Sequence, residues 1–199
     1  MIQINGLTKS YGEKVVFSEL TFSVEENVCT VFSGESGIGK TTLLRCISGL
    51  EKPDSGTVTG LSGKKLSFIF QENRLIPGIS ALDNILCVTP DKERAAYCLE
   101  RAGLADAAKK KAGELSGGMQ RRLSAARALA YGGDVFFFDE PLRELDPDNE
   151  ERMLRFIKEE TAGRTVLLIT HEKRHADFLA KNTLSFHGFP MRLRQETDQ

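Results

Sequence analysis

The chain has 199 residues with a formal net charge of −1, and 40% of its residues are hydrophobic. A chain of this length can bury a sizeable core, and its balanced charge creates no bulk field toward nucleic acid or anionic membranes. No stretch approaches the ~20 apolar residues that a membrane-spanning helix requires, so we expect a soluble protein with one domain over residues 1–199. Four cysteines without CxxC spacing predict reduced, buried thiols of a cytosolic protein: Cys29, Cys46, Cys87 and Cys98.

The first part of the chain contains short β-rich segments. Those at residues 2–5 and 20–24, with turn residues at 12–13 and 25–27, predict an antiparallel edge sheet. The next run, residues 28–32, is apolar throughout and does not alternate. Such a run is typical of a strand that is covered on both faces in a parallel sheet.

A glycine-rich segment follows this strand. Gly34 and Gly39 are separated by four residues and are followed by Lys40, Thr41 and a helical apolar pattern. This spacing is typical of a phosphate-binding loop, in which backbone N–H groups and a helix N-terminus surround an anion. Lys40 would reach the β- and γ-phosphates of a nucleotide, and Thr41 would bind Mg²⁺ through its hydroxyl. A plain glycine-rich turn is the alternative. The predicted nucleotide-binding positions are Ser33, Gly34, Glu35, Ser36, Gly37, Ile38, Gly39, Lys40, Thr41 and Thr42.

The middle of the chain is predicted to be helical. After a β-rich run at residues 66–70, the strand signal disappears between about residues 80 and 131, where Ala, Leu, Lys, Glu and Arg dominate. Within it, Ser116 precedes Gly117, Gly118 and a strong helical pattern. Ser116 therefore stands where an N-cap belongs, and the glycines leave backbone N–H groups uncovered. A capped helix start explains this segment by itself.

Two carboxylates follow the next apolar run. Asp139 and Glu140 come directly after residues 135–138, and ligands bind at the carboxyl ends of strands in open α/β sheets. In a nucleotide site Asp139 would hold Mg²⁺, and Glu140 would polarise the attacking water as general base. A solvated strand end with two charges is the alternative. Further strands are expected at residues 166–170 and 183–186, and the tail after Pro190 is expected to fray.

Three motifs in this order resemble the ATP-binding-cassette (ABC) family of transporter ATPases. They are the phosphate loop, Leu115-Ser116-Gly117-Gly118 and Phe138-Asp139-Glu140, and the resemblance covers nearly the whole chain. It implies an α/β fold: a P-loop NTPase core with a mostly parallel sheet, an N-terminal antiparallel β subdomain and a helical subdomain inserted at about residues 80–131. Such a protein binds ATP with Mg²⁺ and hydrolyses the ATP.

The resemblance also implies roles for residues outside the phosphate loop. Tyr11 would stack on adenine, Gln71 would reach Mg²⁺ and the attacking water, and His171 would contact the γ-phosphate. Ser116, Gly117 and Gly118 would face the nucleotide of an opposite subunit, and Asp146 matches the loop that crosses between two cassettes. Members of the family commonly have small residues where this chain has Arg143 and Glu144, and Gln where it has Met119.

Partners follow from the same resemblance. Two ATPase subunits, identical or different, would close over two ATP molecules and part after hydrolysis. Transmembrane permease subunits on separate chains would dock near Gln71, so the protein would be cytoplasmic and peripheral on the inner face of the cell membrane. Membrane contact would run only through the permease, and no direct nucleic-acid contact is expected.

Other functions remain open at this point. A cytosolic ABC protein that acts on DNA or ribosomes would usually need a tandem cassette, a coiled coil or zinc modules. A small-molecule phosphotransferase would leave Ser116 and His171 without a role. His171 and His175 have the spacing of a metal-binding pair on a helix, but the sequence provides no evident third ligand.

Overall fold

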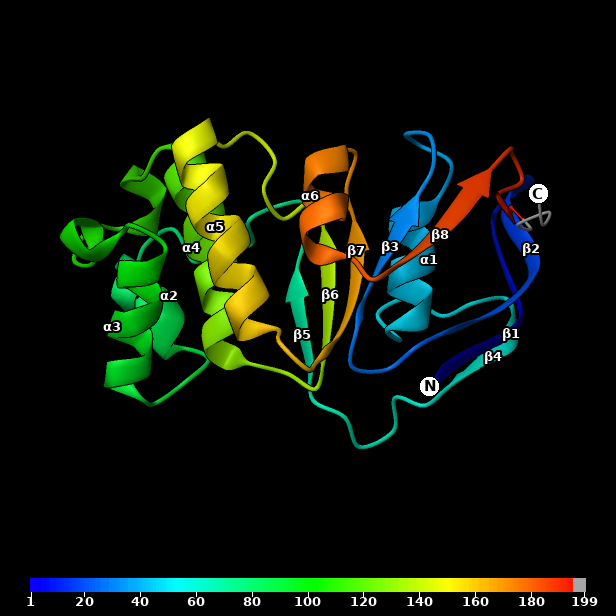
Figure 1. The fold of residues 1–199 in the computed structure, drawn as a ribbon, viewed down its shortest axis with the longest axis horizontal. Coiled ribbons are helices and arrows are strands. Elements are labelled where there is room, and N and C mark those ends of the chain that lie inside the picture. Colours follow the sequence, from blue (N-terminus) through cyan, green and yellow to red (C-terminus); the bar gives the residue numbers. More distant parts are fainter. Residues whose placement is uncertain (195–199) are drawn as a thin grey trace. The chain divides into compact units, whose positions relative to one another are not determined.

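The computed structural model describes residues 1–194, and residues 195–199 lie outside the described part. The chain divides into two compact units, which are described one at a time (Figure 1). The first unit comprises Met1–Lys64 and Gly163–Gln199, and the second comprises Lys65–Ala162. The helical segment predicted at residues 80–131 lies entirely within the second unit.

The first unit contains the expected antiparallel sheet. Strand β1 (Ile2–Tyr11) lies between β2 (Lys14–Val24) and β4 (Ser55–Thr59) and is antiparallel to both. The β1–β2 register runs from Ile2 opposite Val24 to Tyr11 opposite Lys14, across the tight turn at residues 12–13. Alternating apolar side chains at residues 2–5 and 20–24 are buried, and this periodicity predicted those segments. The strands are longer than predicted, because β1 continues to Tyr11 and β2 begins at Lys14.

Up to Arg194, the same unit carries four further strands and two helices. Strand β3 (Cys29–Ser33) lies between β7 (Thr165–Ile169) and β8 (Asn182–His187), parallel to both, and β9 (Arg192–Leu193) pairs antiparallel with β8. Helix α1 (Lys40–Ile47) follows β3 after the loop at residues 34–39, and α6 (Lys173–Leu179) follows β7 (Figure 1). Phe22 of β2, Phe32 of β3 and Phe186 of β8 form a ring cluster with centroids 5.4–6.0 Å apart. This cluster joins the antiparallel sheet to the parallel strands.

The second unit combines two parallel strands with helices. Strand β5 (Leu66–Ile69) pairs with β6 (Val135–Asp139), and the helices are α2 (Ala81–Leu86), α3 (Lys92–Arg101), α4 (Gly117–Tyr131) and α5 (Pro147–Glu160). Two short 3₁₀ turns, Ala105–Ala107 and Ala112–Glu114, lie between α3 and α4. The buried Ser67 hydroxyl donates to the Ala128 carbonyl over 2.8 Å, which ties β5 to α4. The predicted α/β class, with an antiparallel N-terminal sheet and parallel strands, is confirmed.

Some sequence expectations need correction. Strands β4 and β9 were not predicted, and β9 lies in the tail that was expected to fray. The part of that expectation that concerns residues 195–199 lies outside the described residues. Cys87, the C-cap residue of α2, is exposed and Cys29 is only partly buried, so the prediction of four buried thiols was wrong. Burial does raise the thiol pKa of Cys29 to about 12 and of Cys98 to about 11.

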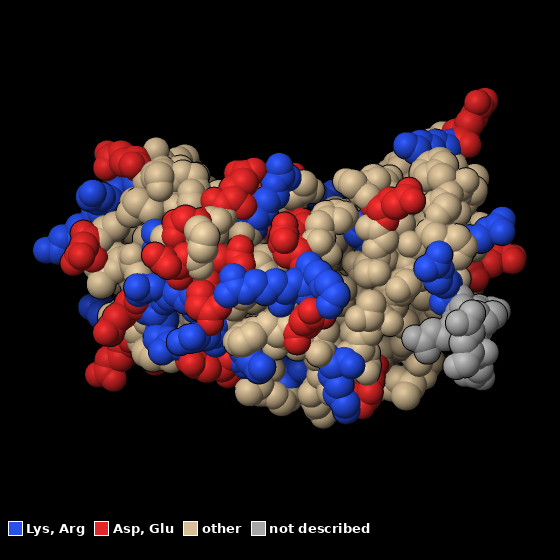
Figure 2. Space-filling model, turned by 45° about the horizontal axis from the view of Figure 1, so that its top comes forward, with Lys and Arg blue, Asp and Glu red and all other residues tan. Residues whose placement is uncertain are grey.

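Acidic and basic side chains are interspersed on the face that Figure 2 presents. This mixture is what a net charge of −1 leads one to expect. Within residues 1–194, every helix falls short of the length and hydrophobicity that crossing a bilayer requires.

Candidate functional site

The glycines of the phosphate loop are required by the backbone. Gly34 has a φ of 150°, and a Cβ there would lie 2.5 Å from the Phe186 carbonyl oxygen. Gly39 has a φ of 115°, and its Cβ would collide with Cγ1 of Val16. Gly37 also has a positive φ, of 77°, but open space surrounds it. The two ends of the loop therefore have no room for a side chain, whereas its middle does.

Lys40 lies against this loop. It is 5% exposed, and its ammonium donates to the Gly34 carbonyl over 2.7 Å and to the Glu35 carbonyl over 2.6 Å. Helix α1 has Gly39 as its N-cap, with no side-chain cap and no acidic residue in its first turn. Its N–H groups and the positive end of its dipole are therefore suited to an anion, next to a buried ammonium. This geometry supports the phosphate-binding interpretation over a plain turn.

Two more predicted residues lie in the first unit. Tyr11, at the end of β1, is half-exposed and donates its hydroxyl to Glu51 Oε1. Burial of the hydroxyl, together with this bond, raises the pKa of Tyr11, and the Thr42 side chain is also in hydrogen-bond contact with it. Tyr11 therefore lies beside the start of α1 with part of its ring open to solvent. His171 is exposed just after β7.

The second histidine of the i, i+4 pair, His175, lies on helix α6. It is buried, and its Nδ1 lies 3.2 Å from the Thr170 hydroxyl. Among residues 1–194 there is no group of three or more His, Cys, Asp or Glu side chains that could hold a metal ion. The two histidines of this pair therefore differ, because His171 is exposed and His175 is buried.

The acidic pair lies at the end of a fully buried strand in the second unit. All five residues of β6 are buried, and Asp139, the last of them, is 5% exposed. Glu140 follows with a φ of 49°, a left-handed conformation that is uncommon for a residue with a side chain. Strained backbone of this kind is concentrated at functional sites, where the surroundings hold it in place.

A buried arginine that sequence reasoning did not single out holds this strand end. Arg121 of α4 is 4% exposed, and its Nη2 donates to the carbonyls of Asp139, over 3.0 Å, and of Glu140. Its Nη1 donates to the carbonyls of Phe70, over 2.6 Å, and of Gln71, over 3.1 Å. One guanidinium thus connects the acidic pair to the segment that carries Gln71. Burial lowers the pKa of Arg121, but an arginine remains protonated at neutral pH.

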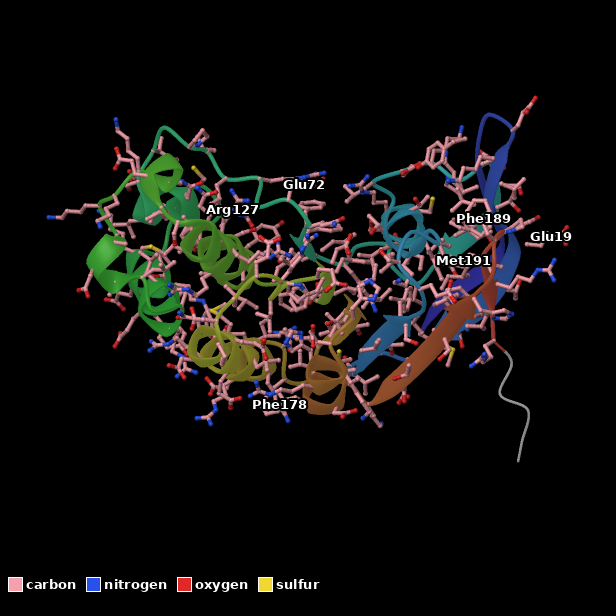
Figure 3. The ribbon with its side chains drawn as sticks, turned by 90° about the horizontal axis from the view of Figure 1, so that it is seen from above. Glu19, Glu72, Arg127, Phe178, Phe189 and Met191 are labelled. Atoms are coloured by element: carbon pink, nitrogen blue, oxygen red, sulfur yellow. The ribbon has the colours of Figure 1, made fainter. Side chains whose placement is uncertain are left out.

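Two other side chains fix the segment after β5. Arg127, also on α4 and labelled in Figure 3, is one of them. Its guanidinium donates to the Arg74 carbonyl over 2.8 Å. The buried Asn84 accepts from the Ile76 N–H and donates to the Ile76 carbonyl, at 2.9 and 3.0 Å. The segment that exposes Gln71 is therefore held by side chains of α2 and α4.

Ser116 and Asp146 are both N-caps. The Ser116 hydroxyl accepts from the Met119 N–H over 3.3 Å at the start of α4, as its sequence position predicts. Asp146 accepts from the Asn149 N–H over 3.0 Å and precedes Pro147 at the start of α5. The Asn149 side chain also donates to Asp146, and these bonds lower the pKa of the carboxyl.

A polar pocket brings several of these residues together. It has a volume of about 360 Å³ and lies within the second unit. Gln71 and Gly117, both predicted site residues, share it with the buried Arg121. The full lining is Gln71, Glu72, Asn73, Gly117, Arg121, Arg143 and Glu144.

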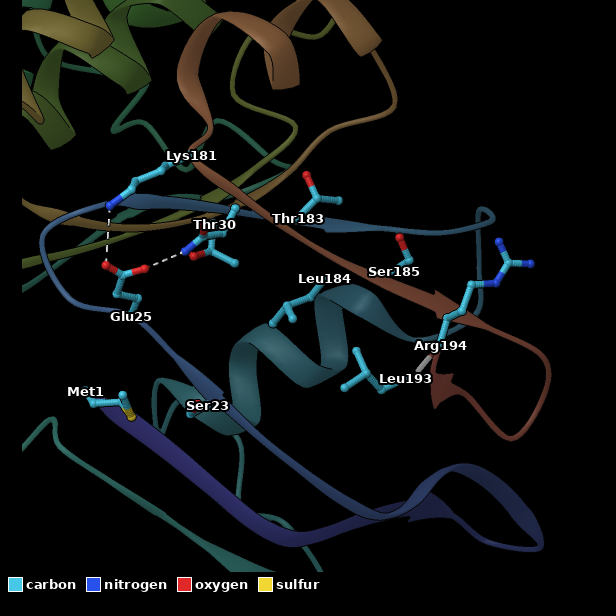
Figure 4. Close-up of a pocket in the computed structure, with 11 residues that line it drawn as sticks. Met1, Ser23, Glu25, Thr30, Lys181, Thr183, Leu184, Ser185, Leu193 and Arg194 are labelled. Carbon is cyan, nitrogen blue, oxygen red and sulfur yellow. Dashed lines mark hydrogen bonds and ion pairs between the residues drawn. The ribbon is translucent and has the colours of Figure 1, made fainter. Parts of the chain in front are cut away.

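A larger pocket, of about 740 Å³, lies in the first unit along β8 (Figure 4). At one end Glu25 accepts from Asn182 over 2.9 Å and from Lys181 over 3.4 Å, and the two partners lower the pKa of its carboxyl. None of the predicted site residues lines this pocket.

Comparison with known proteins identifies the family. A family model described as ABC transporter matches residues 17–143. The aliphatic sulfonates import ATP-binding protein SsuB 1 of Rhodococcus jostii is 38% identical over 92% of this chain and 78% of its own length. The chain belongs to the ABC transporter family.

Other relatives agree with this assignment. The lipoprotein-releasing system ATP-binding protein LolD of Bacteroides thetaiotaomicron is 33% identical over 87% of this ABC cassette and 91% of its own length. A dimeric ATP-binding cassette, solved in a post-hydrolysis state with ADP and Pi, has a TM-score of 0.85 at 27% identity, covering 98% of this chain and 97% of that one. Family membership means that the cassette binds ATP, and it supports a transport role over action on DNA or ribosomes.

Proposed function

We propose that this chain hydrolyses ATP and thereby powers a membrane transporter whose permease subunits are separate chains. The observation that carries the proposal is Glu140, a carboxylate in left-handed backbone at the end of a buried strand, in a chain of the ABC transporter family. A strand end of this kind is suited to hold a general base in a fixed position toward water.

The residues of the two units would have different roles in ATP binding and hydrolysis. Lys40 and the N–H groups at the start of α1 would bind the phosphates, and the half-exposed ring of Tyr11 would stack on adenine. His171, exposed after β7, would contact the γ-phosphate. Glu140 would accept a proton from the attacking water, and Gln71 would orient that water.

The predicted ligands have the oxygen donors that Mg²⁺ prefers. Gln71 and Asp139 of the second unit offer an amide and a carboxylate, and Thr41 of the first unit offers a hydroxyl. Mg²⁺ in nucleotide sites usually has only one or two protein carboxylates and completes its shell with water and phosphate oxygens. When bound, the ion would neutralise charge on the phosphates. Asp139, 5% exposed, would be its main protein ligand.

We further propose that two copies act together. Ser116, Gly117 and Gly118 begin a helix of 15 residues, and Ser116 and Gly117 are exposed. The N–H groups at a helix start bind anions, so this corner could complete the phosphate site of a second subunit. The related dimeric cassette solved with ADP and Pi supports this arrangement. ATP would favour the closed dimer through contacts of the γ-phosphate that ADP cannot make.

Cargo selection would belong to the partner subunits. SsuB 1 is named for sulfonate import and LolD for lipoprotein release, so the relatives serve chemically different cargo with similar cassettes. This fits a subunit that supplies free energy without contacting cargo. The protein would then be cytoplasmic and would lie on the inner face of the membrane through its permease.

The decisive experiment replaces Glu140 with Gln. We expect Glu140→Gln to bind ATP with unchanged affinity but to lose turnover about 10²- to 10⁴-fold, the range that general-base catalysis contributes. It should also accumulate as an ATP-bound dimer. Steady-state ATPase assays, equilibrium binding of a fluorescent ATP analogue and light scattering measure the three quantities.

A matched control is Glu151→Gln on α5, which should behave as the unmodified chain in all three assays. Wild-type turnover by Glu140→Gln would remove Glu140 from the role of general base. Affinity purification from the native membrane tests the transport role, because an integral-membrane partner should copurify. Recovery of ribosomes or DNA instead would refute that role.

A further inference from the structure

We propose that Arg143 and Glu144 recognise a second copy of this chain through two reciprocal ion pairs, Arg143 of each copy meeting Glu144 of the other. This inference rests on the dimer of the proposed function and names the residues that would select the partner subunit. The two opposite charges would then favour a dimer of two identical cassettes.

Arg143 and Glu144 are available for such contacts. They lie in the turn at residues 141–144, and their side chains are 55% and 73% exposed. Within the chain, Arg143 Nε lies 3.0 Å from Glu144 Oε1. For the other guanidinium nitrogens and the second carboxylate oxygen, the part of the chain that the structure describes shows no partner. Each side chain therefore has hydrogen-bonding capacity left for another molecule.

The turn adjoins the start of α4, where Ser116, Gly117 and Gly118 are proposed to complete the phosphate site of a second subunit. Arg143 and Glu144 line the same 360 Å³ pocket as Gly117. A Cβ on Gly118 would lie 3.7 Å from Leu145 Cδ2 and 3.8 Å from the Glu144 carbonyl oxygen, so the turn packs against the start of α4. If that corner faces the nucleotide of a second copy, the adjacent charges must face the second copy as well.

Neighbouring opposite charges suit a twofold interface. In a symmetric dimer the same patch meets itself, so that residue i contacts residue j and residue j contacts residue i. An Arg beside a Glu is complementary to its own rotated copy, and one patch then forms two attractive pairs. Charge pairs of this kind discriminate between partners mainly because wrong combinations place like charges opposite each other.

Backbone geometry supports a specific role for this turn. Glu144 has a φ of 64°, a left-handed conformation that glycine or asparagine would adopt more readily. The position nevertheless carries a long acidic side chain. The conformation fixes the direction from which the carboxylate leaves the backbone, next to Arg143.

The test uses charge reversal in the Glu140→Gln chain with Mg-ATP, with the dimer dissociation constant measured by sedimentation equilibrium. Arg143→Glu places two acidic side chains on each copy, and Glu144→Arg places two basic ones. Each variant alone should dimerise at least about tenfold more weakly, an effect that salt reduces. An equimolar mixture of the two should recover parent-like affinity as a heterodimer, which is visible with chains carrying different fluorophores.

The mixture separates contacts between copies from those within a chain. Neither reversed chain can form the internal Arg–Glu pair, so recovery on mixing can come only from pairing across the interface. The double variant Arg143→Glu/Glu144→Arg should dimerise like the parent and confirms that the turn still folds. Arg155→Glu, which breaks the exposed Arg155–Glu151 pair on α5, is the matched control and should change nothing.

Each result has a distinct meaning. Single reversals that dimerise like the parent, or a mixture no tighter than its components, would overturn the inference and leave the proposed function intact. If the parent chain with Mg-ATP stays monomeric, the proposed dimer fails, and the reciprocal pairs fail with it.

Discussion

The phosphate loop and the acidic strand end reach their conformations by different means. The loop is shaped by residues that lack side chains: Gly34 and Gly39 have left-handed φ values and occupy positions where a Cβ would meet Phe186 or Val16. The strand end is shaped by one long side chain, Arg121, which donates to the carbonyls of Asp139 and Glu140 from another element. The first conformation depends on glycines within the loop, which let it approach Phe186 and Val16 closely, and the second depends on a side chain from another helix.

The strand end should be the more sensitive of the two to a single substitution. Arg121→Met keeps much of the side chain's volume but removes its donors, which leaves buried carbonyls of β6 and of the segment after β5 without partners. Each such loss costs about 1–3 kcal/mol, so we expect unfolding free energy to fall by roughly 3 kcal/mol or more. ATP turnover should fall as well, because Glu140 loses its support. Urea denaturation and ATPase assays measure both effects.

Arg155→Met on α5 is the control, because that side chain is exposed and should change stability by less than about 0.5 kcal/mol. Arg121→Lys, which keeps a charge but has fewer donors, should fall between the two. Equal stability of Arg121→Met and the parent would show that the strand end holds its conformation without the arginine.

Adding a methyl group to a loop glycine tests whether crowding is the reason that the loop requires glycine. Gly34→Ala introduces a Cβ 2.5 Å from a backbone oxygen that cannot move easily, so the loop must shift. We expect ATP affinity to fall at least about tenfold, which corresponds to about 1.4 kcal/mol. Fluorescent nucleotide titration measures the change.

Gly37→Ala is the matched comparison, because Gly37 also has a positive φ but has open space around it. Its main cost should be the strain of a left-handed alanine, about 1–2 kcal/mol of folding stability, and its ATP affinity should fall less than that of Gly34→Ala. If both variants bind ATP alike, crowding at the base of the loop is not what requires glycine there.

The smallest expected effect concerns a helix cap of the second unit. Asp146→Ala removes the acceptor for the Asn149 N–H at the start of α5 and should lower the Tm by a few degrees at pH 7. The folded protein holds the pKa of Asp146 below its ordinary value of 3.8, so the stabilisation is fully present above pH 3.8. It is lost as the pH falls through the lower folded value.

The difference in Tm between the parent and Asp146→Ala should therefore shrink under strongly acidic conditions. Calorimetry at several pH values checks this. Leu142→Met, at a buried position of the preceding turn, serves as a substitution whose effect should not follow that pH dependence. A difference that stays constant down to the acid limit would mean that the carboxylate charge contributes nothing to the cap.

Short-range sequence patterns predicted much of the fold. The remaining features depend on contacts between residues distant in sequence, which such patterns do not reveal. The sequence signals for the phosphate loop, the buried strand ending at Asp139 and the cap at Ser116 each lie within a short segment. Strand β4 was missed because Ser55, Gly56 and Thr57 carry almost no apolar signal, and its partner β1 is far away in sequence.

The sequence carries a weaker indication of the role of Arg121 than of the motifs named above. It shares a helix face with Ala125 and Ala128, both buried, at spacings of four and seven residues. That face indicates a core position, where an arginine requires partners. The identity of those partners, carbonyls some 18 to 51 residues away, follows only from the folded chain.

Lys40 is held in place by the loop itself. Its ammonium is buried and donates to the Gly34 and Glu35 carbonyls. An arriving triphosphate offers the same ammonium acceptors with full negative charge, so occupancy would exchange partners rather than reshape the peptide. A lysine side chain that is held in this way has less conformational freedom to lose when it binds an anion.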